Sequence, residues 1–215
     1  MNKTFFFRYI IPGLFCLFSI ALIAGILLCS SVLQNQKEIA SHVLRLHIIA
    51  NSDQAQDQRI KLQVRDRILS DCGFLFQNCT NAQEAAKRAK TYAPLLQRTA
   101  QAELKKQGFL GRASVTIEPC RFPTRDYGGV RLPAGTYTAV NIRIGAAAGH
   151  NWWCVMYPPL CLTGDAVKAD DETLQDLRQE LSAEEYAMVT QTGEIRIQMK
   201  LKIAEILSQY FPIFK

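Results

Sequence analysis

A cysteine and a histidine four positions apart, Cys154 and His150, are the residues whose types could do chemistry. A thiol beside an imidazole is the starting point of nucleophilic catalysis, because the imidazole takes the proton whose loss makes the sulfur reactive. This pattern raises the hypothesis of a thiol-dependent hydrolase of cell-wall or peptide bonds. The plainer interpretation is a loop histidine beside a structural cysteine.

A second pattern places two basic side chains on one face of an extended segment. Arg45 and His47 alternate with apolar residues in Val43–Asn51, and a period of two is typical of a strand. The pair could form a partly buried polar network or a partner-binding patch. Carboxylates that could engage the pair follow on the next segment: Asp53, Asp57 and Asp66.

Other chemical signatures are missing from the sequence. The three histidines form no His-x-x-x-His pair and the cysteines form no Cys-x-x-Cys pair, so we expect no metal site. Standard hydrolase motifs are also missing. The formal net charge of +6 is mild, and no basic run is interleaved with aromatic residues. We therefore expect no cofactor, no catalytic residues, no nucleic-acid partner and no small-molecule substrate.

The N-terminal segment differs in character from the rest. Tyr9–Leu33 carries no charge, and Lys3 and Arg8 precede it. As a helix this stretch exceeds the ~30 Å core of a bilayer, and the flanking positive charge favours an N-terminus inside. An uncleaved anchor and a cleaved signal peptide both fit. We expect residues 1–33 to be this leader and residues 34–215 to be one domain outside the cytoplasm.

Cysteine positions allow local disulfides in an oxidising compartment. Cys154 and Cys161 flank a double proline, and Cys72 and Cys79 flank a short loop. Either pair could close locally, which would leave Cys120 unpaired, and the pair that we expect to close is Cys154 with Cys161. Spacing alone does not fix the connectivity.

The expected elements alternate between strand and helix. Val43–Asn51 should be a strand, with Asn51, Ser52 and Asp53 suited to capping the helix that follows. Further elements are expected in the ranges 54–71 (helix), 82–107 (helix, kinked or divided at Pro94, capped by Thr80 or Asn81), 113–119 (strand), 122–135 (turn-rich connection), 170–191 (two short helices) and 194–203 (helix or strand). This order predicts an α+β fold, with a small, mostly antiparallel sheet packed with helices, preceded by one N-terminal transmembrane or signal helix.

Two β-rich runs form the expected centre of the domain. Thr136–Ile144 alternates with a period of two, and Asn151–Tyr157 ends at two prolines. The short loop 146–150 between them predicts a hairpin. Trp152 and Trp153 are adjacent, so on a strand they point to opposite faces, one towards the core and the other available to a partner.

Several separate blocks resemble the stage II sporulation protein R family. They are Leu44-Arg-Leu-His-Ile-Ile-Ala-Asn-Ser-Asp53 with Lys61-Leu-Gln-Val-Arg-Asp66, then Leu132-Pro-Ala-Gly-Thr-Tyr137, and Asn151-Trp-Trp-Cys-Val-Met-Tyr-Pro-Pro-Leu-Cys161. The resemblance implies a non-enzymatic signalling protein, exported from the forespore and either membrane-anchored or secreted into the intermembrane space. There it would activate a membrane-embedded aspartic protease of the mother cell, which processes a sigma-factor precursor.

Three hypotheses follow. The leading one is the activating ligand, which we expect to touch its partner through a single face: Arg45, His47, Asn51, Asp53, Arg65 and Asp66, with Trp152 or Trp153. The second is the hydrolase that uses Cys154 and His150. The third is a passive wall-binding or septum-binding module.

Overall fold

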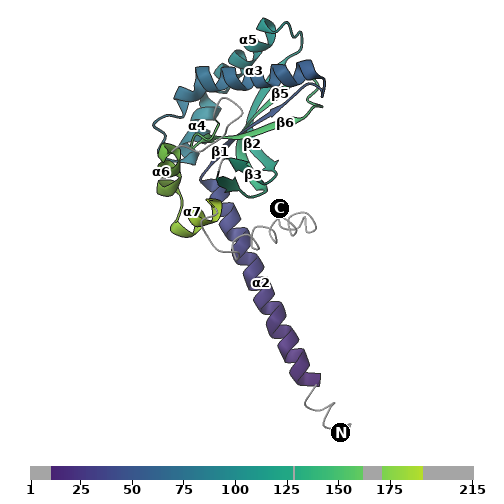
Figure 1. The fold of residues 1–215 in the computed structure, drawn as a ribbon, viewed down its shortest axis with the longest axis vertical. Coiled ribbons are helices and arrows are strands. Elements are labelled where there is room, and N and C mark those ends of the chain that lie inside the picture. Colours follow the sequence, from purple (N-terminus) through teal and green to yellow (C-terminus); the bar gives the residue numbers. More distant parts are fainter. Residues whose placement is uncertain (1–10, 128, 162–170, 191–215) are drawn as a thin grey trace.

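The structure is a computed structural model that describes residues 11–127, 129–161 and 171–190. It is an α+β fold in which helices pack on a mixed sheet (Figure 1). In chain order the elements are α2 (Ile11–Ser41), β1 (Leu44–Ile49), α3 (Ala55–Cys72), η2 (Gly73–Leu75), α4 (Ala82–Thr91), α5 (Ala93–Lys106), β2 (Ala113–Phe122), β3 (Arg125–Tyr127), β4 (Val130–Leu132), β5 (Gly135–Ile144), β6 (Asn151–Tyr157), α6 (Asp171–Glu180) and α7 (Ala183–Val189).

The main sheet has the strand order β2-β5-β1-β6, which corrects the expected hairpin. β1 lies between β5 and β6, parallel to β5 and antiparallel to β6, while β2 is antiparallel to β5. β1 is buried along almost its whole length. A strand so deeply buried gains most from a place with a neighbour on each edge. The loop after β5 crosses the end of β1, where Gly149 N donates to Ala50 O at 3.0 Å.

One face of the sheet packs against α3, α4 and α5. Leu46 and Ile48 of β1 are fully buried there with Val64 of α3 and Leu96 of α5. Figure 1 shows α3 and α5 lying together over the strands. Helices α4 and α5 are separate because Pro94 cannot continue the first helix and starts the second, as expected. Asn81 caps α4 by accepting from Glu84 N.

The expected cap of α3 was wrong. Helix α3 begins after Gln54, whose side chain makes no capping bond. Asn51 Nδ2 and Ser52 Oγ donate instead to Asp57 Oδ2, at 2.8 and 2.5 Å. Their side chains therefore hold the loop to the first turn of the helix from the side and leave the helix end itself without a side-chain cap.

Helix α2 is continuous through the expected boundary at residues 33 and 34. Gln36 and Ile39 near its C-terminal end are buried, whereas Phe15 and Phe18 near its other end are 71% and 68% exposed. Figure 1 shows the helix projecting from the sheet as a long rod. Across the described residues, no helix combines the length and apolar character that a bilayer crossing requires.

The chain between β2 and β5 contains a short ladder where only turns were expected, because β3 and β4 pair antiparallel. This ladder brings Tyr127 onto the main sheet. The two helices expected near the C-terminus are confirmed as α6 and α7, and Ser182 with Glu185 forms a capping box at α7. The ambiguous segment 194–203 lies outside the described residues.

Candidate functional site

The second face of the sheet carries the polar side chains of the central strands. Residues paired in register point to the same face of a sheet. His47 pairs with Asn141 on β5 and with Trp153 on β6. We call this surface the polar face and define it by six residues: Arg45, His47, Cys120, Asn141, Asn151 and Trp153.

His47 is the centre of the polar face. Its Nδ1 lies 3.0 Å from Asn141 Oδ1, and its Nε2 lies 3.1 Å from Asn151 Oδ1. The ring stacks on Trp153 with centroids 3.8 Å apart and planes 8° apart. Burial lowers the pKa of His47, and the two amides oppose that change. The ring is therefore neutral at neutral pH and held in one orientation.

Cys120 reaches the same imidazole from β2. Its Sγ lies 3.4 Å from His47 Nδ1, although 73 positions separate the two residues in the chain. The side chain is half-buried. Burial is the main cause that raises the pKa of the Cys120 thiol; Glu118 adds to the rise, while Arg143 and Arg45 oppose it. The pair is thus a protonated thiol beside a neutral base.

Arg45 is fully buried within a cage of aromatic rings. Its guanidinium carbon lies 4.1 Å from the centroid of Phe122 and 4.7 Å from that of Tyr137. Arg45 Nη2 donates to the hydroxyl of Tyr127. Burial lowers the pKa of Arg45. The interaction of the cation with the ring faces offsets part of the cost of its desolvation. Arg45 is therefore the buried member of the polar face.

Arg65 lies on the other side of the sheet. Its guanidinium stacks 4.2 Å from the centroid of Trp152 and forms an ion pair with Asp66 at 2.6 Å. Arg45 and His47 do not engage the carboxylates of the next segment, because they point away from α3; they form the alternative considered, a buried polar network. The two tryptophans do point to opposite faces, and both are half-buried.

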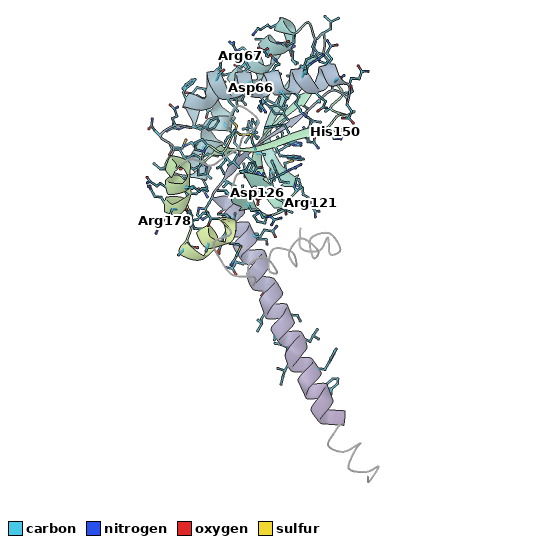
Figure 2. The ribbon with its side chains drawn as sticks, in the orientation of Figure 1. Asp66, Arg67, Arg121, Asp126, His150 and Arg178 are labelled. Carbon is cyan, nitrogen blue, oxygen red and sulfur yellow. A yellow bond between two sulfur atoms is a disulfide. The ribbon has the colours of Figure 1, made fainter. Side chains whose placement is uncertain are left out.

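Asn51 and Asp53 lie at a third place, beside the loop after β5. Asn51 Oδ1 accepts from Ala146 N at 2.9 Å, and Asp53 Oδ1 lies 2.5 Å from His150 Nδ1. Figure 2 shows His150 at the outer end of the strands, apart from Asp66 on α3. The single contact face expected from sequence is thus divided over three places.

The pair of Cys154 and His150 that the hydrolase hypothesis needs does not form in this structure. Cys154 is buried and joined to Cys161 in a disulfide, and His150 is paired with Asp53. Cys72 and Cys79, the other pair considered, are both free thiols. A disulfide between Cys154 and Cys161 suits the turn at the double proline, where the two Cα atoms are 5.4 Å apart.

Sequence reasoning missed Cys120, Asn141 and Asn151 as neighbours of His47. Their alternation within each strand was visible, but the register between strands was not. Over residues 11–127, 129–161 and 171–190, no group of three histidine, cysteine or acidic residues is placed to hold a metal ion.

The fold and the polar face define a small α+β module joined to a long N-terminal helix. The profile described as stage II sporulation protein R (spore_II_R) matches residues 40–168, more than half of the chain. The chain therefore belongs to the stage II sporulation protein R family.

A curated relative was also found. Stage II sporulation protein R of Bacillus subtilis (strain 168) is 36% identical over 138 residues, which cover 62% of this chain and 62% of the relative. The chain thus matches less than two thirds of that relative's length. No solved structure matches the chain.

Proposed function

We propose that this chain is an exported sporulation signal that activates a membrane-embedded aspartic protease of the mother cell, leading to processing of a sigma-factor precursor. The family match over residues 40–168 carries this proposal, because it includes the whole polar face and the loop beside it. In this role the chain acts by contact with its partner.

The leader and the disulfide support export from the forespore. Tyr9–Leu33 is uncharged, and large apolar side chains of α2 such as Phe15 and Ile26 are exposed to solvent. Burial of such a surface in a membrane would be favourable. The bond between Cys154 and Cys161 suits an oxidising compartment outside the cytoplasm. We therefore place the α+β module in the intermembrane space, either anchored or released.

The structure narrows the choice of contact residues. Arg45, His47 and Arg65 are buried, so they support the surface from within. Asp53 is exposed and holds the exposed His150 beside it. We propose that this end of the sheet, with the half-buried Trp153 near it, contacts the protease. An exposed carboxylate and an exposed imidazole on two adjacent loops suit a transient, orientation-specific contact.

The test is co-reconstitution of the full chain with the protease and its sigma-factor precursor in liposomes. Cleavage of the precursor should require the chain. Asp53→Ala should lower the cleavage rate about tenfold, which corresponds to ~1.4 kcal/mol of lost contact energy. Asp71→Ala is the matched control, because Asp71 is a carboxylate at the opposite end of α3, where it pairs with Arg67.

The activating role and the proposed contact can be contradicted separately. Cleavage at the same rate with and without the chain would remove the activating role. Wild-type cleavage with Asp53→Ala and with His150→Ala would leave the role in place and remove the proposed contact.

A further inference from the structure

We propose that Cys120 and His47 form an acyl-transfer site, in which the sulfur of Cys120 attacks a peptide or ester carbonyl and the imidazole of His47 moves the proton. The pair differs from the Cys154 and His150 pair that the sequence pointed to. The proposal is independent of the signalling role, since contact with a protease needs no nucleophile and an acyl-transfer site needs no protease.

Geometry singles out Cys120 among the described thiols that are free. Its Sγ lies 3.4 Å from His47 Nδ1, whereas the Sγ of Cys72 donates to Thr99 Oγ1 at 3.7 Å and that of Cys79 donates to Leu75 O at 3.8 Å. Cys120 is on β2, which is an edge strand among the described strands. Its side chain is half-buried, so a reagent can approach the sulfur.

The surroundings of His47 are arranged for a ring that gains a second proton. Asn141 Oδ1 and Asn151 Oδ1 face one ring nitrogen each. A neutral imidazole carries one N–H and can donate to only one of these oxygens. A proton that arrives from Cys120 gives the ring a second donor, and both amides then stabilise the imidazolium.

Asn151 and Asn141 are positioning residues, as is Trp153. Asn141 Nδ2 donates to Ala139 O at 3.3 Å, which keeps its oxygen directed at the ring. The stacked indole of Trp153 fixes the plane of the imidazole. A base that is already oriented loses little freedom when the reaction starts.

The resting pair is neutral, so the thiolate forms only when the proton moves to the ring during attack. Burial raises the pKa of the Cys120 thiol and lowers the pKa of the His47 imidazole, so the proton starts on sulfur and the acceptor is vacant. The charged groups that face the pair are Arg45 and Arg143, which favour a thiolate, and Glu118, which disfavours it. Sulfur becomes nucleophilic as the proton moves to Nδ1.

The reaction balances with water as the only co-reactant. Sulfur bonds to the carbonyl carbon while its proton passes to His47. The imidazolium then protonates the leaving amine nitrogen or ester oxygen, and the bond from carbon to that atom breaks to leave a thioester on Cys120. Water, deprotonated by His47, attacks the thioester; the carboxylic acid leaves and the thiol regains its proton.

The test uses the full chain and p-nitrophenyl acetate, with release of nitrophenol followed by absorbance and the acetylated cysteine located by mass spectrometry. Wild-type protein should be acetylated on Cys120 at least about tenfold faster than on Cys79, which is also half-buried but lacks an imidazole. Cys120→Ala should abolish the fast phase, and Cys79→Ala should leave it unchanged. His47→Gln should slow the fast phase about 100-fold.

A second variant keeps the test decisive if the buried His47→Gln protein does not fold. Asn151 is exposed, so Asn151→Ala should fold normally. This variant lacks an oxygen that favours the protonated ring. Its rate should therefore be lower, and the rise of its pH–rate profile should move to lower pH. Equal labelling of Cys79 and Cys120, or a wild-type rate and pH profile for Asn151→Ala, would overturn the proposal.

Discussion

Arg45 of β1 donates a hydrogen bond to the hydroxyl of Tyr127 on β3, although 82 positions separate them in the chain. Arg45 Nε and Nη1 find no partner within the described part of the chain. The hydroxyl of Tyr127 is therefore the acceptor that ties this buried guanidinium to the short β3–β4 ladder. The same hydroxyl also lies 3.4 Å from Trp153 O on the polar face.

Tyr127→Phe should destabilise the fold by about 1–3 kcal/mol, because it leaves a buried charged donor without its acceptor. The ring and its packing are retained, so the loss reports the hydroxyl alone. Urea unfolding followed by circular dichroism measures it. Tyr92→Phe, at a position 43% exposed, is the control and should change the free energy of unfolding by less than about 0.5 kcal/mol. Equal stability of the two variants would contradict this account.

Gly149→Ala should lower the free energy of unfolding by at least about 1–3 kcal/mol, because the added methyl group overpacks a close contact. A Cβ at this position would lie 2.2 Å from the backbone oxygen of Ser52, which a side-chain rotation cannot relieve. Gly73→Ala is the matched control, because a Cβ there meets nothing within 4 Å. The melting temperatures of both variants measure the difference. A Gly149→Ala protein as stable as Gly73→Ala would show that the loop after β5 moves freely.

The free energy of unfolding should decrease as the pH is lowered, because the native fold disfavours protonation of His47. Burial holds the pKa of the native ring below its ordinary value, so the unfolded chain binds the proton first as pH decreases. This contribution is therefore present above pH ~6.5 and is lost as pH falls below it. Unfolding by urea between pH 5 and 8 should show the slope in wild-type protein. A His47→Gln protein with the same slope would exclude His47 as its source.

Removal of the disulfide should lower stability by about 2–3 kcal/mol. Cys154 and Cys161 are separated by 7 positions, and a loop this short contributes about that much through the unfolded state. The Cys154→Ala/Cys161→Ala double variant in urea unfolding measures the change, with dithiothreitol-treated wild-type protein as the comparison. The double variant should retain its fast acetylation at Cys120. An unaltered midpoint would mean that the bond does not form in solution.

Local patterns in the sequence predicted most elements but not their neighbours. The alternation in β1 and β5 and the break at Pro94 each depend on residues close in the chain, and each was correct. The expected hairpin of β5 and β6 was wrong, because a short loop favours pairing only when no third strand competes. The buried strand β1 takes the position between them.

The candidate site depends on register between strands that are distant in sequence. His47 was identified early, but its neighbours were expected on the adjoining helix. They come instead from β2, β5 and β6. A shift of one residue in any of these pairings would turn Cys120 or Asn151 to the opposite face. A single sequence does not encode that register in any local pattern.

The unbroken helix α2 limits how the sheet can be oriented. At 1.5 Å per residue, its 31 residues make a rod about 46 Å long, and its last turns are embedded beside the sheet through Ile39. The module therefore cannot swivel as it would on a flexible tether. Any contact that holds the first turns of this helix also fixes the direction in which Asp53 and Cys120 face. A partner therefore has to approach from that side.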